Sequence, residues 1–387
     1  MNTYLLPIFI YLAFSVVYNL VFAVASLFRI KKNNSSHLTG LNKIAVFIPA
    51  YKEDTIIVDT ANKALAQYYP TDLYQVIVIA DSLKQETLAD LRKLPIKVVE
   101  VSFEKSTKAR AINKTYETLK EYFDITVVLD ADNVMEPDFL NKINEAYNHG
   151  ANVMQGHRIA KNQQNGLSTL DAISEEINNN IYRKGHQNLG LSSALIGSGM
   201  AFDYKLFKKE MSRIDAIGGF DKELELNLLK QKQKIVYLQD AFVYDEKVSE
   251  MKAFGNQRTR WIAAQIRYGM QSFGDALIQL FKRGNVDYFD KSLQFLLPPR
   301  LILLGILVLT AIVTTVFQIA GWELSLLLTT VYGTALMLAV PRKFFNMNSL
   351  KAAMQLPRTF LLMLVAFGGY KKAKTNFLHT PHQTVQS

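Results

Sequence analysis

Cysteine is absent from the 387 residues of this chain. Disulfide bridges, thiolate zinc sites, iron–sulfur ligation and cysteine nucleophiles are therefore excluded. The glycine-rich phosphate loops GxGxxG and GxxxxGK[ST] are missing too, so nicotinamide dehydrogenases and P-loop ATPases lose their main sequence support. Any nucleotide would have to be held by side chains, a metal ion and strand-end loops.

Charge is sparse but biased. Charged residues make up 20% of the chain and apolar residues 49%, which excludes a disordered protein. The mean hydropathy of +0.05 lies between the values of soluble enzymes and polytopic membrane proteins. The formal net charge of +10 would suit nucleic acid, an anionic membrane or an anionic ligand. No basic segment with interleaved aromatics is present, so we expect no nucleic-acid partner.

The first 28 residues contain no charge, and Arg29, Lys31 and Lys32 follow them. This stretch exceeds the ~20 residues that cross a bilayer. A secretory signal carries its positive charge before a shorter apolar stretch, whereas here the charge comes after. We therefore expect an uncleaved anchor with its amino end outside and its basic flank in the cytosol. A cleaved signal is the alternative.

A second apolar region lies near the other end of the chain. Residues 301–322 and 324–341 are uncharged, with Glu323 between them and Arg342 after them. They predict two spans joined by a turn near residues 321–323. The apolar tract at 359–370 is short for a span and predicts an interfacial or re-entrant helix. The expected protein is multi-pass, in contact with lipids of a plasma or bacterial inner membrane, with a cytosolic middle.

The middle of the chain has a soluble composition with short apolar runs between polar stretches. Runs rich in β-branched residues predict buried strands at residues 44–48, 75–80, 96–101 and 125–129. Helices are predicted between them at residues 54–67, 84–94 and 106–122. This alternation is typical of an α/β domain with a mostly parallel sheet, which binds ligands beyond the carboxyl ends of its strands.

Two carboxylates, Asp130 and Asp132, follow the fourth predicted strand. Such a pair can hold Mg²⁺ or Mn²⁺ together with substrate phosphates. Aspartate is also common in strand-end turns for conformational reasons, and that alternative applies to Asp81 after the second strand as well. The buried strand before Asp130 favours the metal site, because a buried aspartate needs a partner.

In their order along the chain these motifs resemble the membrane-bound family 2 glycosyltransferases, whose catalytic domain has the GT-A fold and uses a nucleotide-diphosphate sugar with Mg²⁺ or Mn²⁺. The resemblance covers about residues 43–300. It implies that the base, the ribose and the diphosphate are bound at successive strand ends. The implied donor-binding residues are Ala50, Tyr51, Glu53, Asp81, Lys108 and Asp130, and the implied metal ligands are Asp130 and Asp132.

Gln257, Arg260 and Trp261 match the family's Q-x-x-R-W signature, although an ordinary amphipathic helix with arginines could also contain them. The resemblance places them in the catalytic site, where an aromatic plane stacks on the acceptor sugar and a guanidinium faces a diphosphate. The family's catalytic base opens an amphipathic helix that comes earlier in the chain, at residues 222–229. An ungapped alignment places Asp221 at that position, whereas a register with a two-residue gap would place Glu223 there.

The resemblance implies inverting transfer of a hexose from a nucleotide sugar, with UDP as the expected nucleotide, to a glycan or polysaccharide at the membrane. Asp221 would take the proton of the acceptor hydroxyl, and Lys108 and Arg260 would stabilise the departing diphosphate with the cation. A single-addition enzyme acting on a lipid and a catalytically inactive sugar-binding protein are the alternatives. A polymer channel would need a homo-oligomer or an export partner, because three spans are too few to enclose one.

The sequence thus predicts three units: a transmembrane anchor at residues 1–30, a GT-A domain at 31–290 and a membrane region at 291–387. His157 and His186 are expected at the surface or in the core, because no His/Asp spacing fits a transition-metal site.

Overall fold

A computed structural model describes residues 6–29, 40–163, 165–216, 218–248 and 250–369. Lys31 and Lys32, predicted to flank the first span, and residue 370 of the short apolar tract lie outside these ranges. The described chain forms an eight-stranded sheet in the order β3-β2-β1-β4-β7-β6-β8-β5. Its strands are β1 (Ile44–Tyr51), β2 (Tyr74–Asp81), β3 (Lys97–Val101), β4 (Ile125–Val128), β5 (Val134–Met135), β6 (Val153–Ala160), β7 (Met200–Asp203) and β8 (Ile235–Asp245).

The α/β class with a mostly parallel sheet is confirmed. Parallel pairs join β1 to β2, β1 to β4, β2 to β3 and β6 to β8. Antiparallel pairs join β4 to β7, β6 to β7 and β5 to β8. The four predicted strands are present as β1 to β4. Side chains of β1 from Ile44 to Ile48 are fully buried, because helices cover both faces of this part of the sheet.

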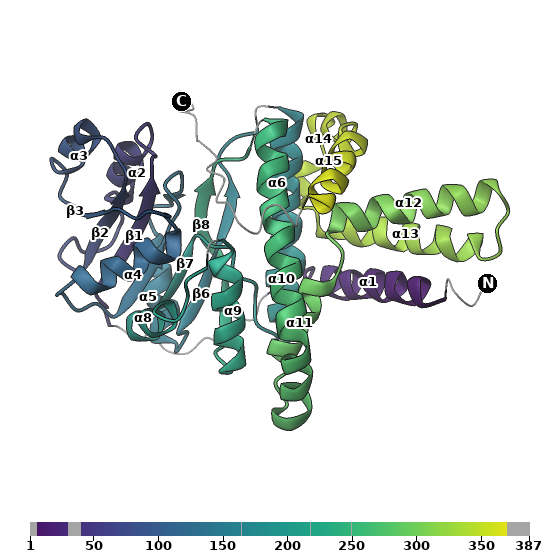
Figure 1. The fold of residues 1–387 in the computed structure, drawn as a ribbon, viewed down its shortest axis with the longest axis horizontal. Helices are drawn as coiled ribbons and strands as arrows, with labels where there is room; N and C mark the ends of the chain where they lie inside the picture. The colour runs from purple at the N-terminus through teal and green to yellow at the C-terminus, as the bar shows by residue number, and fades with distance from the viewer. Residues whose placement is uncertain (1–5, 30–39, 164, 217, 249, 370–387) are drawn as a thin grey trace.

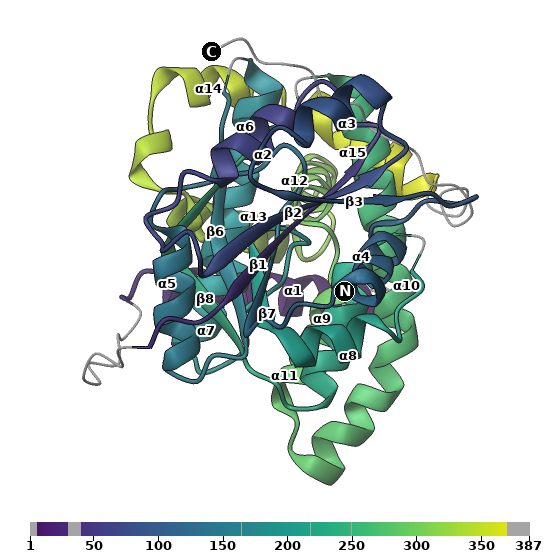
Figure 2. The same ribbon diagram turned by 90° about the vertical axis from the view of Figure 1, so that its left-hand side faces the viewer.

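Helices pack on both faces of the sheet (Figure 2). One face is covered by α2 (Ile57–Ala64), α3 (Gln85–Leu91) and α5 (Phe139–Asn148), and the other by α4 (Lys108–Thr118), α8 (Tyr204–Met211) and α9 (Phe220–Lys230). The helix predicted at 106–122 begins at Lys108, because the Thr107 side chain accepts a hydrogen bond from the N–H of Arg110 and caps the first turn.

A layer of long helices separates the sheet from the apolar helices (Figure 1). It comprises α6 (Gly166–Asn178), its π-helical continuation η1 (Asn179–Gly185), α7 (His186–Asn188), α10 (Met251–Arg283) and α11 (Val286–Leu296). The expected boundary between residues 290 and 291 falls inside α11. Helix α11 of this layer therefore belongs partly to the expected catalytic domain and partly to the expected membrane region.

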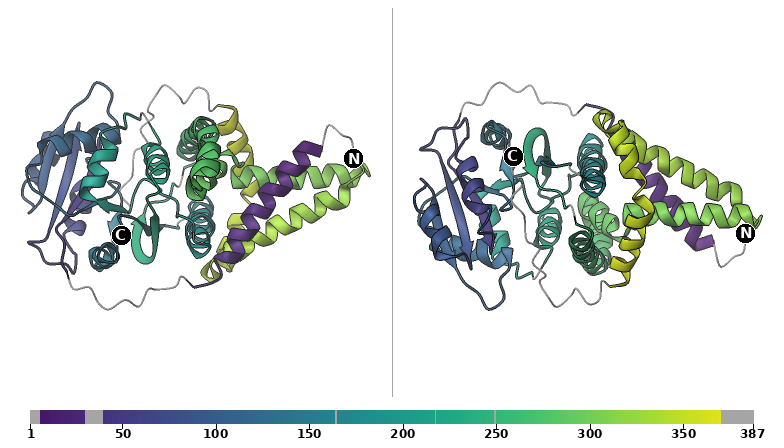
Figure 3. Two further views of the ribbon diagram at one scale, coloured as in Figure 1. Left: turned by 90° about the horizontal axis from the view of Figure 1, so that it is seen from below. Right: turned by 90° about the horizontal axis from the view of Figure 1, so that it is seen from above.

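Three apolar helices extend together from this layer, on the side away from the sheet (Figures 1 and 3). They are α1 (Leu6–Ala25), α12 (Arg300–Val316) and α13 (Trp322–Ala339). The turn predicted near residues 321–323 is present, with Gly321 at a φ of 98° before α13. Helices α1 and α13 are each long and apolar enough to cross a membrane. Up to four crossings result if α11 with α12, and the two helices that follow α13, each count as one bent span.

The chain then passes through the short helix η2 (Arg342–Phe344) into α14 (Met347–Ala353) and α15 (Leu356–Gly368). Helices α14 and α15 meet at an angle of 47°. They lie across the base of the three apolar helices rather than alongside them (Figure 3). The short apolar tract that predicted an interfacial or re-entrant helix thus forms most of α15. Its position relative to a membrane stays a prediction.

Gly185 of η1 tests the contact between the helical layer and the first apolar helix. A Cβ added to Gly185 would lie 2.2 Å from the carbonyl oxygen of Phe22 in α1. We expect Gly185→Ala to lower the free energy of unfolding by about 1–3 kcal/mol, because neither backbone can move freely. Thermal unfolding of the purified protein in detergent measures the change.

Gly274→Ala in α10 is the matched control, because an added Cβ there meets nothing within 4 Å. This substitution should leave stability unchanged or raise it by about 0.5–1 kcal/mol, since alanine is the better helix former. Equal thermal midpoints for the two variants would contradict the packing described.

Candidate active site

The carboxyl ends of β1 and β2 form one corner of the site. Tyr51 pairs with Asp81 across these strands, and the N–H of Lys52 donates to the carbonyl oxygen of Asp81 at 3.1 Å. Lys52 and Ser82 have left-handed backbones, with φ of 56° and 59°. Such conformations are costly for residues other than glycine and occur where a site requires a sharp turn. The predicted donor-binding residues at this corner are Ala50, Tyr51, Glu53 and Asp81.

The loop before β7 meets the end of β4 and the start of α4 at Gly197. The Lys108 ammonium group donates to Asp130 Oδ1 at 2.6 Å and to the carbonyl oxygen of Gly197 at 2.7 Å. The N–H of Asp130 donates to the Ser198 hydroxyl at 2.8 Å. Gly197 has a φ of 83°, which glycine adopts without strain. The contact fixes one cation and one carboxylate beside each other.

Asp132 has a different environment from Asp130. Its carboxylate is buried and accepts hydrogen bonds from the Asn133 amide at 3.0 Å and from the N–H of Glu246 at 3.1 Å. The Asn133 amide also donates to Asp245 Oδ1 at 3.0 Å. Asp132 therefore ties the turn after β4 to the loop after β8, whereas 38% of the Asp130 side chain remains accessible.

Behind Asp132 lies a buried cluster of charged side chains, which we call the charge cluster. Its members are Arg158 on β6, Glu175 on α6, Arg183 on η1, Asp245 at the end of β8 and Lys247. Glu175 lies 3.0 Å from Arg158, 3.5 Å from Arg183 and 3.6 Å from Lys247, and Lys247 lies 2.6 Å from Asp245. Burial alone would raise the pKa of Glu175, but the charges of Arg158 and Lys247 hold it well below its usual range.

The two candidate bases differ in their surroundings. Asp221 lies in the first turn of α9 and lines the cavity described below. A Cβ added to Gly197 would lie 3.7 Å from the carboxyl carbon of Asp221, so Asp221 is close to the site of Lys108 and Asp130. Glu223 instead accepts a hydrogen bond from the Tyr268 hydroxyl at 2.8 Å and is outside the cavity lining.

Helix α10 carries the predicted residues Gln257, Arg260 and Trp261. Arg258 between them pairs with Asp171 of α6, and its guanidinium lies 4.3 Å from the centroid of the Trp261 ring. Burial lowers the pKa of the Arg260 guanidinium. Among the described residues, the buried Gln257 Oε1 has no hydrogen-bond partner, so it is available to a ligand. The indole of Trp261 is 37% exposed, so an aromatic surface is available as well.

One cavity of about 1220 Å³ brings most of these side chains together. Its lining includes Lys108, Asp130, Asp221, Gln257, Arg260 and Trp261. Ala50, Tyr51, Glu53, Asp81 and Asp132 lie outside that lining. The predicted site residues therefore fall into two groups, the corner at β1 and β2 and the cavity. Asp132, in the turn after β4, belongs to neither group.

The hydrogen bonds of Ser198 and Asn133 at this site were not predicted from the sequence. Ser198 donates to Asn133, and both side chains support the turn that carries Asp130. His157 pairs with Glu176 at 2.9 Å, and the fully buried His186 bonds to Tyr18 at 3.0 Å. Both histidines are therefore engaged within the fold, as expected.

Residues 42–264 match the family described as "Glycosyltransferase like family 2". The chain belongs to this family. It is therefore a nucleotide-sugar transferase by family, and the sequence motifs that suggested the resemblance lie within or next to the matched segment. No curated protein matches the sequence.

One of three solved structures compared with this chain shows a similar fold. The mannosyltransferase PcManGT from Pyrobaculum calidifontis, solved with GDP-Man and Mn²⁺, has a TM-score of 0.52 and 14% identity over 85% of this chain and 96% of its own. TarS from S. aureus has a TM-score of 0.39 and 18% identity over 63% of this chain and 44% of TarS. Its segment 1–349 has a TM-score of 0.43 and 13% identity over 85% of this chain and 91% of that segment.

Replacing Glu175 tests whether the charge cluster stabilises the fold. Glu175→Gln removes the negative charge that three buried cations contact. We expect a loss of about 3–5 kcal/mol in the free energy of unfolding, because uncompensated charge remains in the interior. Thermal or chemical unfolding in detergent measures it.

Glu117→Gln is the control, because Glu117 pairs with Lys114 at the surface with 66% of its side chain exposed. Such a pair contributes about 0–1 kcal/mol. Similar midpoints for the Glu175 and Glu117 variants would show that the charge cluster has no structural role.

Proposed function

We propose that this protein is an inverting, metal-dependent glycosyltransferase that acts at a membrane. The observation that carries the proposal is the convergence of Lys108, Asp130 and Asp221 at Gly197, within a cavity that Trp261 also lines. A cation and carboxylates beside an aromatic surface suit a diphosphate leaving group and a sugar acceptor. A direct displacement needs no covalent nucleophile.

In this proposal the corner at β1 and β2 binds the nucleoside. The half-buried ring of Tyr51 would offer a stacking surface for a base, and the buried carboxylates Glu53 and Asp81 would offer hydrogen-bond acceptors for a ribose. Lys108 and Arg260 then carry positive charge toward the diphosphate. The depressed pKa of the desolvated Arg260 reflects a guanidinium that would gain from a bound anion.

Asp130 and Asp132 are the proposed protein ligands of the cation. Carboxylate oxygens suit Mg²⁺ or Mn²⁺, and the accessible carboxylate of Asp130 fits an ion that takes its other ligands from substrate oxygens and water. The described residues contain no group of three or more His, Asp or Glu side chains that could hold a metal ion. When bound, the cation would neutralise charge on the leaving diphosphate.

Asp221 is the proposed general base. It would accept the proton of the acceptor hydroxyl while the acceptor oxygen bonds to the anomeric carbon and the nucleoside diphosphate departs. Its place on the cavity wall favours it over Glu223, whose carboxylate is engaged by Tyr268. Gln257 and Trp261 would position the acceptor.

The membrane topology is also a proposal. An anchor at residues 1–30 and a membrane region at 291–387 would hold the catalytic domain, residues 31–290, on the cytosolic side. The apolar helices α1, α12 and α13 extend to one side of the sheet domain, which supports membrane attachment from that side (Figure 1). Arg29 and Arg342 would then lie on the cytosolic face.

UDP is the proposed donor nucleotide, and GDP is the second candidate. UDP is expected from the family resemblance, whereas the structure of PcManGT holds GDP-Man with Mn²⁺. A labelled donor sugar distinguishes the alternatives. The label would enter a polymer if the acceptor is a polysaccharide, a lipid extract if it is a lipid, and neither if the protein only binds sugar.

The base is tested by transfer from labelled UDP and GDP sugars, with membranes that contain the full chain. We expect Asp221→Asn to lower the rate about 10²–10⁴-fold, because proton transfer to a positioned base is lost. Glu223→Gln should keep most of the rate. If Glu223→Gln abolished transfer and Asp221→Asn kept it, the base would be Glu223, as in the alignment with the two-residue gap. Full activity of both variants would contradict a base in α9.

The cation is tested in the same assay. Chelation with EDTA should abolish transfer, and Mn²⁺ or Mg²⁺ should restore it, because the leaving diphosphate is stabilised by the ion. Undiminished transfer in EDTA would rule out the metal-dependent mechanism.

A further inference from the structure

The cavity changes character along its length. At the sheet end its walls carry Lys108, Asp130 and Asp221. Toward the apolar helices the same cavity is lined by Leu301 and Leu304 of α12, Leu336 and Met337 of α13, and Leu350 of α14. A glycan chain needs hydrogen-bond partners along its path, and these five apolar side chains offer none, although Asn346 and Ser349 also line the cavity. An apolar chain would fit them.

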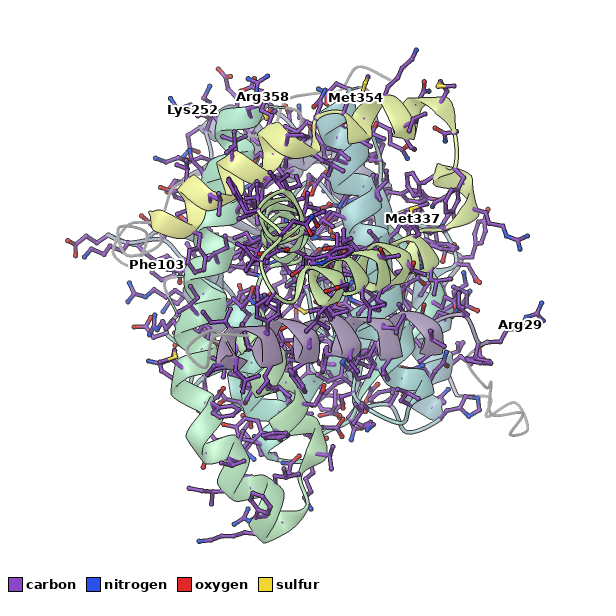
Figure 4. All side chains as sticks on the ribbon, turned by 90° about the vertical axis from the view of Figure 1, so that its right-hand side faces the viewer. Arg29, Phe103, Lys252, Met337, Met354 and Arg358 are labelled. Carbon is purple, nitrogen blue, oxygen red and sulfur yellow. The ribbon has the colours of Figure 1, made fainter. Side chains whose placement is uncertain are left out.

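The apolar end of the cavity reaches the outer surface of the membrane-side helices. Of the lining residues there, Met337 is 56% exposed, Phe345 55%, and Met347 and Leu350 64% each. Figure 4, which views the molecule from the side of the apolar helices, shows Met337 on α13 and Met354 at the end of α14 on this surface. Exposed apolar side chains of this size on candidate membrane helices suit contact with lipid.

Arg300 lies in the cavity wall at the start of α12, where the polar and apolar parts meet. Its Nη2 donates to the carbonyl oxygen of Ser174 at 2.9 Å and to the Ser174 hydroxyl at 3.0 Å. Its Nη1 atom is buried and has no hydrogen-bond partner among the described residues. None of the carboxylates among the described residues forms a salt bridge with Arg300. The guanidinium carbon also lies 5.9 Å from the centroid of the Tyr182 ring. These contacts leave Nη1 without a hydrogen-bond acceptor, and a bound anion would supply one.

We propose that the acceptor is an anionic lipid, with its apolar chain between α12, α13 and α14, its phosphate at Arg300 and a hydroxyl of its headgroup at Asp221. This inference rests on the proposed function and names the acceptor class for the same site. The headgroup oxygen bonds to the anomeric carbon, the bond from that carbon to the diphosphate breaks, the hydroxyl proton passes to Asp221 and the nucleoside diphosphate leaves. Arg300 is a positioning residue in this scheme.

The first arm of the test follows the product. Membranes with the full chain receive labelled UDP and GDP sugars with Mn²⁺, and products are separated into chloroform–methanol extract and aqueous polymer. We expect label in the organic extract. Label confined to an aqueous polymer would overturn the lipid acceptor and leave the glycosyltransferase proposal intact, whereas the absence of transfer from every donor would count against both.

The second arm measures binding of dodecyl phosphate to the purified protein in phosphatidylcholine nanodiscs, with dodecanol as the uncharged probe. Arg300→Gln should weaken dodecyl phosphate binding about tenfold to a hundredfold, since a charge-assisted hydrogen bond is lost. Arg300→Lys should restore part of it. Binding of a nucleoside diphosphate with Mn²⁺ should be unchanged in both variants, which also reports that they are folded.

Arg342→Gln is the matched control, because Arg342 is an exposed basic residue near the same helices and outside the cavity lining. It should leave dodecyl phosphate binding unchanged. Equal weakening by the Arg342 and Arg300 variants would reduce the effect to surface charge. Equal affinity for dodecyl phosphate and dodecanol would mean that the cavity binds apolar chains without recognising the phosphate. Either result would overturn the proposal.

Discussion

The ion pairs of Glu175 are the constraint on which the rest of the structure depends. Glu175 lies on α6, and its partners Arg158 and Arg183 lie on β6 of the sheet and on η1, which packs against α1. One carboxylate thereby connects the sheet to the helical layer that contacts the apolar helix α1. A shift of α6 along the sheet would leave buried charges unpaired, and such charges are costly in a low-dielectric interior. The charge cluster therefore fixes position more than it adds net stability.

A chain of hydrogen bonds connects the charge cluster to Asp130 and Lys108. Asp245 of the charge cluster accepts from Asn133, and Asn133 also accepts from Ser198, whose hydroxyl receives the N–H of Asp130. Asp130 then meets Lys108. The orientation of the accessible carboxylate is thus set by partners held by the same cluster that orients α6. Preorganisation of this kind lets a site stabilise charge without rearranging when the charge develops.

The sequence predicted those parts of the fold that depend on neighbours along the chain. Apolar runs predicted β1 to β4, because strands buried in a parallel sheet are mostly apolar. The aspartates after these strands were predicted as site residues, because ligands bind beyond the carboxyl ends of the strands in such sheets. Strand β7 was not foreseen, because its four residues Met200–Asp203 are too few to show a period and it pairs antiparallel with β4. The pairing of Arg258 with Asp171 and the charge cluster were also missed, since their partners are far apart in sequence.

The same distinction explains why the sequence left the acceptor open. Apolar tracts predict helices that meet a membrane, but only their packing makes α12, α13 and α14 a wall of the cavity that contains Asp221. An enzyme that needed the membrane only for attachment could use α1 alone, since α1 is long and apolar enough to cross it. Here the later apolar helices also shape the site, at a point where Arg300 brings a buried charge to the edge of an aliphatic surface. The proposed ligand, which is itself part ionic and part apolar, would pair this charge and cover the aliphatic surface beside it.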